Sequence, residues 1–239
     1  MLDLVLGTVG LQDAAGKLLK GAWLHREELR LPGLALIKKS RYICSYCGVG
    51  SRGSDAVPHG YMTPIDPSRP NWFYTANSTS SAVACPFCAS AQCLNWSVKG
   101  ITVGSGQKSQ TVVPGILISF PWLTQRQLSW IALHALAINS RKIGGVNGPI
   151  HAMSRDVDAA LIATNQELIA NLPIYRGNDS EFVRALSLLP NKFYKYRHKI
   201  IGDVRWWPNL SFWQKEGEYF QAATYKTLEE QYAAQAGRS

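Results

Sequence analysis

The sequence predicts an α+β protein with a mixed N-terminal part, residues 1–122, and a mostly helical C-terminal part, residues 123–239. Two observations support this class. All five cysteines lie within residues 44–93, among short apolar segments of strand length. From residue 124 onward, apolar residues instead recur with the three-and-four spacing of helices. We therefore expect the cysteines to cross-link the first part and helices to build the second.

The first eighty residues are predicted to contain few helices or strands and one long loop. Residues 2–8, "LDLVLGT", alternate apolar and polar side chains and predict a strand. Residues 16–30 predict a short strand or a helix, and the charges of "HREELRL" favour a helix that ends at Pro32. Residues 49–81 are rich in glycine, proline, serine and asparagine, which predicts a loop.

Three shorter segments lead to the helical part. Residues 81–88, "SAVACPFC", predict a short strand that runs into a cysteine turn. Residues 100–113 predict another loop. Residues 115–123, "GILISFPWL", predict a buried strand or an extended run.

The C-terminal part begins with the clearest helix of the chain, over residues 124–142. Thr124 is a suitable N-cap, and Gln127 stands at the capping-box position. Glycines at positions 144, 145 and 148 are expected to end this helix. The remaining predictions are helices over 152–172 and 179–189, a basic aromatic stretch over 191–213, and an exposed last helix over 216–235.

The net charge indicates which classes of partner the protein can bind, and the expected cellular compartment indicates the chemistry of its cysteines. The net charge of +9 and the pI near 9.4 favour polyanionic partners: nucleic acid, anionic lipid or an acidic protein surface. No run of eighteen apolar residues occurs, so no membrane span is expected. The start of the chain contains Asp3 and lacks a basic region, which is atypical of a signal peptide. We expect a protein in a reducing cytosol, where paired cysteines bind metal or act in redox chemistry.

The cysteine spacing is that of a metal site. Cys44 and Cys47 form one CxxC pair, Cys85 and Cys88 form a second pair, and 37 residues lie between the two pairs. Two intervening residues allow both sulfurs of a pair to approach one zinc ion, at about 2.3 Å. Gly48 suits the exit of the first tight turn. Two such turns can close a structural zinc site of four sulfurs, with no position left for a substrate.

Other cysteine chemistry remains open at this point. A thioredoxin-like redox pair is disfavoured, because there are two pairs and neither lies in a strand–CxxC–helix context. Four thiolates can also hold an iron–sulfur cluster, although the paired spacing and the long insertion favour zinc. Cys93, the fifth cysteine, is either a substitute ligand or a buried apolar side chain.

The segments "IKKSRYICSYCG", "HG" and "AVACPFC" resemble the zinc-binding HNH (ββα-metal) nuclease module. Together with "ACPFCASAQCLNWS" and "GILISFPWLTQRQLSWIALHALAI", they resemble the IcmJ/DotN family of type IVB secretion and conjugation systems. The resemblance covers residues 1–140. It implies an HNH-like fold without nuclease activity, with one structural Zn²⁺.

The same resemblance implies a cellular role. Members of the family are cytoplasmic subunits held at the inner membrane through partner proteins. They dock on the coupling ATPase, contact other subunits of the coupling complex and help to recruit substrates. An adaptor of this kind is the function expected from the sequence.

The residues that an HNH nuclease needs are largely replaced in this chain. His59 is the one candidate general base, and Ser80 stands where the motif often has asparagine. The metal-binding histidine expected soon after the second cysteine pair is replaced by "ASAQ", beginning with Ala89. We therefore expect no enzyme. The alternatives are an HNH-type DNA endonuclease with His59 as base, or a DNA-binding accessory factor of conjugation.

The basic aromatic stretch is the candidate partner-binding region. The residues singled out are Lys192, Lys195, Arg197, Trp206 and Trp207. Trp and Arg are frequent anchors of protein interfaces, and cations beside aromatic rings also suit nucleic acid or lipid headgroups. The structural alternative is that the aromatic rings belong to the core and the lysines to a solvated face.

Overall fold

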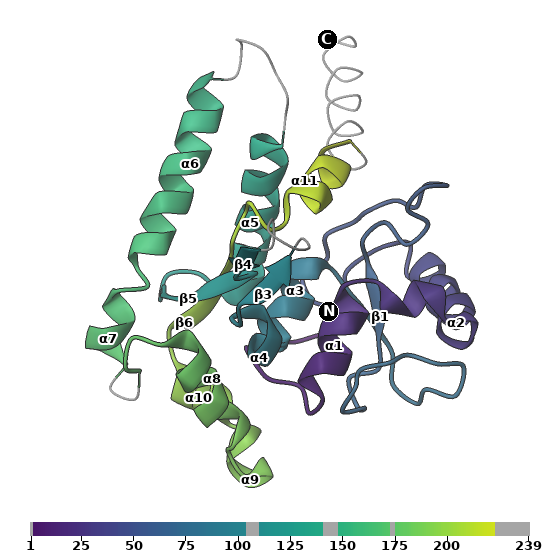
Figure 1. Ribbon diagram of the computed structural model, residues 1–239, viewed down its shortest axis with the longest axis horizontal. Coiled ribbons are helices and arrows are strands. Elements are labelled where there is room, and N and C mark those ends of the chain that lie inside the picture. Colours follow the sequence, from purple (N-terminus) through teal and green to yellow (C-terminus); the bar gives the residue numbers. More distant parts are fainter. Residues whose placement is uncertain (1, 104–109, 141–147, 173–174, 223–239) are drawn as a thin grey trace.

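The computed structural model describes residues 2–103, 110–140, 148–172 and 175–222. The fold is α+β, as predicted: these residues form helices of varied length and three two-stranded antiparallel sheets. The N-terminal helices and the first sheet form one side of the molecule, and the long C-terminal helices form the other (Figure 1).

The N-terminal region is more helical than predicted. It contains α1 (Gln12–Leu19), the 3₁₀-helix η1 (Ala22–His25) and α2 (Glu27–Lys39). Pro32 lies inside α2 instead of ending it. Because proline has no N–H, α2 lacks the hydrogen bond that residue 32 would otherwise donate to the carbonyl of Glu28.

The predicted strand over residues 2–8 does not form. This extended segment bonds to the ends of other elements instead of to a neighbouring strand. The Gly7 amide donates to the Ala91 carbonyl at 3.1 Å, and the Gly7 carbonyl accepts from Leu94 at 2.8 Å. Burial along this segment does not alternate: Leu2 and Asp3 are exposed, whereas Leu6 and Gly7 are buried.

A small ββα unit stands at the centre of the N-terminal side. Strand β1 (Thr63–Ile65) pairs antiparallel with β2 (Ala82–Ala84), and both are buried. Helix α3 (Pro86–Gln92) follows β2 directly and begins with a proline, which suits the first helical position. The predicted loop over 49–81 is correct except for β1.

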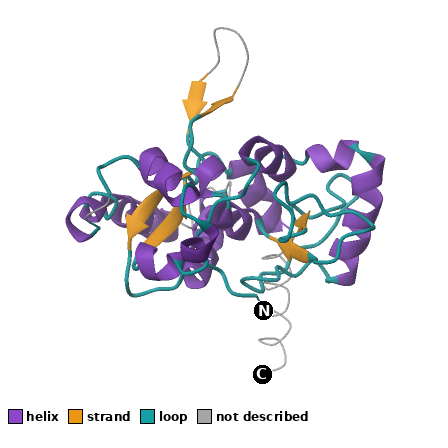
Figure 2. Ribbon diagram, turned by 90° about the horizontal axis from the view of Figure 1, so that it is seen from below, coloured by secondary structure: helices purple, strands orange, loops and turns teal. Residues whose placement is uncertain are grey.

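Two further strand pairs continue the fold. Strands β3 (Ile101–Val103) and β4 (Gln110–Val112) form a hairpin where the sequence predicted a loop, and it projects from the body (Figure 2). It follows the short helix α4 (Leu94–Ser97). Strand β5 (Gly115–Ser119) matches the predicted buried strand and pairs antiparallel with β6 (Val204–Pro208). This sheet joins the two predicted parts of the chain, and a boundary at residue 122 stays a prediction.

The long helix α5 (Gln125–Asn139) begins with the predicted capping box. Thr124 Oγ1 accepts from the Gln127 amide at 3.3 Å, and Gln127 Oε1 accepts from the Thr124 amide at 2.9 Å. Of the three glycines expected to end this helix, Gly148 instead opens α6, and positions 144 and 145 lie outside the described residues.

The remaining helices are shorter than the sequence predicted. The segment 152–172 divides into α6 (Gly148–Ala163) and α7 (Glu167–Asn171). Between these two helices, Asn165 Nδ2 donates to the Leu117 carbonyl of β5 at 2.5 Å. The other helices are α8 (Asp179–Ser187), α9 (Asn191–Tyr194), α10 (Arg197–Ile201) and α11 (Gln214–Phe220). From residue 223 on, the predicted last helix lies outside the described residues.

Aromatic packing connects the two sides. The ring centroid of Phe87, in α3, lies 5.9 Å from that of Trp213 and 6.4 Å from that of Trp206, in β6. All three side chains are buried. The ββα unit therefore rests on residues more than a hundred positions later in the chain. In the described part of the chain, no helix combines the length and apolar character needed to cross a membrane.

Candidate metal centre

The first cysteine pair lies in a tight turn after α2. The Gly48 amide donates to the Cys44 carbonyl at 2.9 Å, and the Cys44 amide donates to the Val49 carbonyl at 2.9 Å. Gly48 has a φ of 78°, a left-handed conformation in which a Cβ atom is strained. The predicted role of this glycine at the exit of the turn is confirmed.

The second pair lies where β2 meets α3. Cys85 is the N-cap of α3, and its sulfur accepts from the Cys88 amide at 3.5 Å. The Cys85 amide in turn donates to the Cys44 sulfur at 3.3 Å. Ser45 holds the two turns together, because its amide donates to the Val83 carbonyl at 2.7 Å and its hydroxyl accepts from the Val83 amide at 3.0 Å.

The four sulfur atoms fit a single tetrahedral ion. All four lie within 4.8 Å of one another, and the sulfurs of Cys47 and Cys85 are 3.7 Å apart. Four bonds of about 2.3 Å in a regular tetrahedron give sulfur–sulfur edges of about 3.8 Å. All four side chains are at most 4% exposed. The cluster can hold a metal ion, out of contact with solvent.

The thiols perturb one another because they are buried together. Burial raises the pKa of the Cys85 and Cys88 thiols well above the ordinary value. Burial also opposes ionisation of Cys44, but hydrogen bonds from the other three thiols outweigh it and lower the pKa of Cys44 well below its ordinary value. One thiolate is therefore favoured, and further thiolates need a compensating cation.

Cys93 lies outside this cluster. It follows α3 as its C-terminal cap, is fully buried, and has its sulfur 3.7 Å from Asn95 Oδ1. Burial raises the pKa of Cys93 to about 12. Of the two alternatives that the sequence left open, the structure places Cys93 as a buried apolar side chain.

His59 is packed among aromatic rings, in the turn before β1. Its ring centroid lies 5.7 Å from that of Trp23, edge to face, and 5.6 Å from that of Tyr61. Its Nδ1 atom is buried without a hydrogen-bond partner among the described residues. Burial lowers the pKa of His59 to about 4. The stretch after the second cysteine pair, where a nuclease would have a metal-binding histidine, begins with Ala89, Ser90 and Ala91, which are all fully buried.

The five residues of the candidate partner-binding set do not lie together. Lys192 and Lys195 are exposed, whereas the Arg197 Nε donates to the Leu6 carbonyl at 2.7 Å. Trp206 and Trp207 are both 0% exposed, which corrects their assignment to a binding surface. Their burial follows from the pairing of β6 with β5, an apolar strand far away in the sequence.

The sequence did not predict the hydrogen bonds that the aromatic side chains of residues 191–213 form. Trp207 Nε1 donates to Asp158 Oδ1 at 2.7 Å, and the Tyr194 hydroxyl bonds the backbone of Thr8. The sequence "VRWWP" does not alternate apolar and polar residues, so it carries no local sign of the strand that it forms.

A metal site closed by four sulfur ligands stabilises the folded protein and does not bind a substrate. A bound ion would occupy all four ligands, leave no open position, and join the turn after α2 to the start of α3. Comparison with known protein families and with curated protein sequences gives no match for this chain.

Proposed function

We propose that the protein is a non-enzymatic adaptor subunit of a type IVB secretion or conjugation coupling complex, built on a scaffold that one structural Zn²⁺ stabilises. The supporting observation is the buried cluster of Cys44, Cys47, Cys85 and Cys88 at the start of the ββα unit. Such a site makes a small mixed region rigid without giving it chemistry of its own.

Zinc is the metal that this ligand set favours. Four thiolates in tetrahedral positions are typical of zinc or of iron–sulfur centres. An iron–sulfur cluster places several atoms between its thiolates, so its cysteine sulfurs lie farther apart than those around one ion. The 3.7 Å separation of the Cys47 and Cys85 sulfurs matches one ion. Cys44, Cys47, Cys85 and Cys88 would hold the zinc ion, which would supply cross-linking energy to the fold.

Two placements favour an adaptor over an HNH-type endonuclease. A general base must come within hydrogen-bond reach of its substrate, whereas His59 is packed between Trp23 and Tyr61. The residues that follow the second pair, where such a nuclease has a histidine for its catalytic cation, are Ala89, Ser90, Ala91 and Gln92, and the first three are fully buried. The order β1, β2, α3, with cysteine pairs before β1 and at the start of α3, supports an HNH-like scaffold that has lost this site.

The partners come from the resemblance of residues 1–140 to the IcmJ/DotN family. On this proposal the protein is cytoplasmic and docks on the coupling ATPase, which holds it at the inner membrane and presents it to substrates. The rest of the coupling complex would supply further contacts.

Affinity capture of the tagged full-length protein from its native cell tests this role. We expect stoichiometric recovery of the coupling ATPase. We also expect one zinc per chain in the purified protein, by mass spectrometry of metals. The variant Cys88→Ser should lose both zinc and ATPase, whereas Cys93→Ser, an equally buried thiol outside the cluster, should keep both.

Other outcomes would overturn the adaptor role. Recovery of nucleic acid without an ATPase would favour the DNA-binding alternative, and the binding should then fall steeply with salt. Metal-dependent DNA cleavage that His59→Ala abolishes would show an active nuclease.

A further inference from the structure

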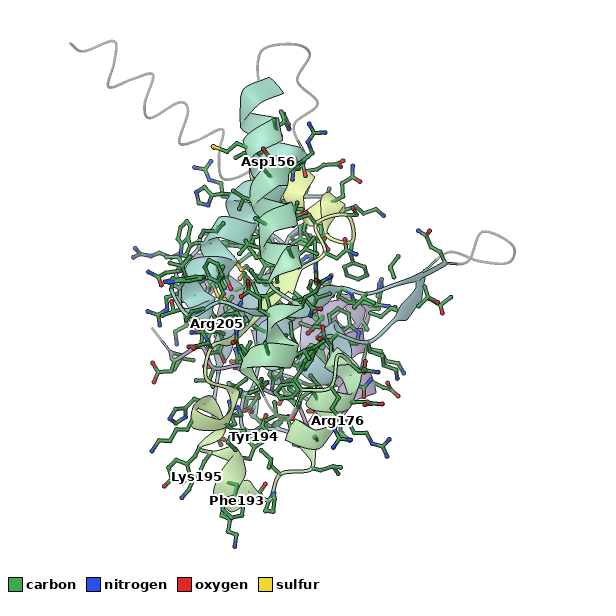
Figure 3. The ribbon with its side chains drawn as sticks, turned by 90° about the vertical axis from the view of Figure 1, so that its left-hand side faces the viewer. Asp156, Arg176, Phe193, Tyr194, Lys195 and Arg205 are labelled. Atoms are coloured by element: carbon green, nitrogen blue, oxygen red, sulfur yellow. The ribbon has the colours of Figure 1, made fainter. Side chains whose placement is uncertain are left out.

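One end of the molecule, residues 188–200, combines exposed apolar side chains with lysines, and we call it the basic tip. It includes the turn before α9, α9 itself and most of α10. Its exposed apolar and aromatic residues are Leu188 (73% exposed), Phe193 (50%), Tyr196 (48%) and Ile200 (37%). Its cations are Lys192, Lys195, Arg197 and Lys199, with no Asp or Glu among them. Figure 1 shows α9 at the extremity of the molecule, and Figure 3 shows Phe193 and Lys195 there.

Two inward-facing side chains fasten the basic tip to the body. The Tyr194 hydroxyl accepts from the Thr8 amide at 2.6 Å and donates to the Thr8 carbonyl at 2.9 Å. The Arg197 Nε donates to the Leu6 carbonyl at 2.7 Å. Because these residues face the N-terminal segment, their neighbours Phe193 and Tyr196 are left facing outward.

The lysines of the basic tip surround the outward rings. Lys192 Nζ lies 4.9 Å from the ring centroid of Phe193, and Lys195 and Lys199 lie 4.8 and 5.6 Å from that of Tyr196. The ion pairs in the described part of the chain lie within residues 26–28 and 66–69. None of the three lysines therefore has a carboxylate partner among the described residues. The basic tip therefore presents uncompensated positive charge around an apolar centre.

We propose that the basic tip binds the surface of an anionic lipid membrane. Phe193 and Leu188 would enter the boundary between headgroups and acyl chains, and the lysines would extend to the lipid phosphates. Leu188 and Ile200 favour lipid over nucleic acid, because aliphatic side chains neither stack on bases nor pair with them. Because the basic tip lies at the extremity of the molecule, it can contact a flat membrane while the other helices and strands keep their positions. This inference goes beyond the adaptor role and does not depend on it.

Co-sedimentation of the full-length protein with vesicles tests the proposal. Vesicles of phosphatidylglycerol mixed with phosphatidylcholine should bind the protein, and salt should weaken the binding. Pure phosphatidylcholine vesicles should bind it poorly. Since each lysine near an anionic surface contributes about fivefold to affinity, the triple variant Lys192→Gln, Lys195→Gln, Lys199→Gln should lose about 100-fold.

A second variant tests the apolar contribution. Leu188→Ser with Phe193→Ser should lower the affinity by at least about tenfold, because both side chains leave water on binding. The controls change exposed residues elsewhere: the triple variant Lys20→Gln, Lys38→Gln, Lys39→Gln, which removes the same number of charges, and Trp122→Ser, whose side chain is 73% exposed. The controls should bind vesicles like the unchanged protein.

Three results would overturn the membrane proposal. The first is equal binding to charged and neutral vesicles, or no binding to either. The second is a loss of binding in the control variants as large as in the tip variants. The third is a tip-dependent affinity for a DNA duplex with none for vesicles, which would assign the basic tip to nucleic acid. Capture of the coupling ATPase is unaffected by any of these, so the two proposals fail separately.

Discussion

Serine at position 88 removes one sulfur from the four-cysteine cluster, and serine at position 93 removes a sulfur from the same small region outside it. Both thiols are 0% exposed, and Cys93 caps the helix that contains Cys88. The pair therefore isolates metal binding from the general cost of changing a buried thiol. We expect Cys88→Ser to destabilise the protein far more.

The magnitudes follow from linkage and burial. A ligand at 1,000 times its dissociation constant stabilises the folded state by about 4 kcal/mol, which a chain of this size expresses as about 8–16 °C in melting temperature. Cys88→Ser should lose most of this. Cys93→Ser should cost about 1 kcal/mol, or about 2–4 °C, because Asn95 Oδ1 can accept from the new hydroxyl.

The assay is thermal unfolding of the purified proteins by circular dichroism, together with zinc content per chain. Addition of a strong chelator to the unchanged protein should reproduce the melting temperature of Cys88→Ser. Equal losses in the two variants, or a full zinc content in Cys88→Ser, would refute the assignment of the four ligands.

Two other perturbations test the packing. The pKa of His59 is 6.5 in the unfolded chain and about 4 in the folded protein. Between these pH values, unfolding therefore takes up a proton. The free energy of unfolding should fall by about 3 kcal/mol as the pH drops from 6.5 to 4. Chemical denaturation across this range should show a shallower loss for His59→Gln than for the exposed control His25→Gln, and identical slopes would contradict the buried neutral ring. Gly115→Ala would place a Cβ atom 2.5 Å from the Trp206 ring and should cost about 2–3 kcal/mol, whereas Gly50→Ala meets nothing within 4 Å. Equal melting temperatures for the two alanine variants would mean that β5 and β6 are not packed as described.

Features encoded within a few residues could be predicted from the sequence. The capping box of α5 and the two cysteine turns depend on side chains three or four positions apart, and both form as expected. The grouping of the two turns was also predictable, because tetrahedral zinc needs four ligands and the chain offers two pairs.

Features that depend on distant partners could not be predicted. Residues 2–8 have the alternation of a strand, but a strand also needs a neighbour, and no strand in the described part of the chain pairs with them. Trp206 and Trp207 stand among cations, which suggested a surface, but β5 pairs with their strand and buries both rings. In each case the deciding contact joins segments that no local pattern connects.

Because β5 pairs with β6, the parts of the protein cannot all fold at the same time during synthesis. Both cysteine pairs have been made by residue 88, so their turns can meet while the later helices are still being translated. Strand β5 must wait for residues 204–208, a delay of about 5–20 s at ordinary rates of translation. Throughout this interval Phe87 lacks the rings of Trp206 and Trp213, so the nascent chain leaves the ribosome with an apolar face uncovered. Chaperone contact is expected at that face until β6 arrives.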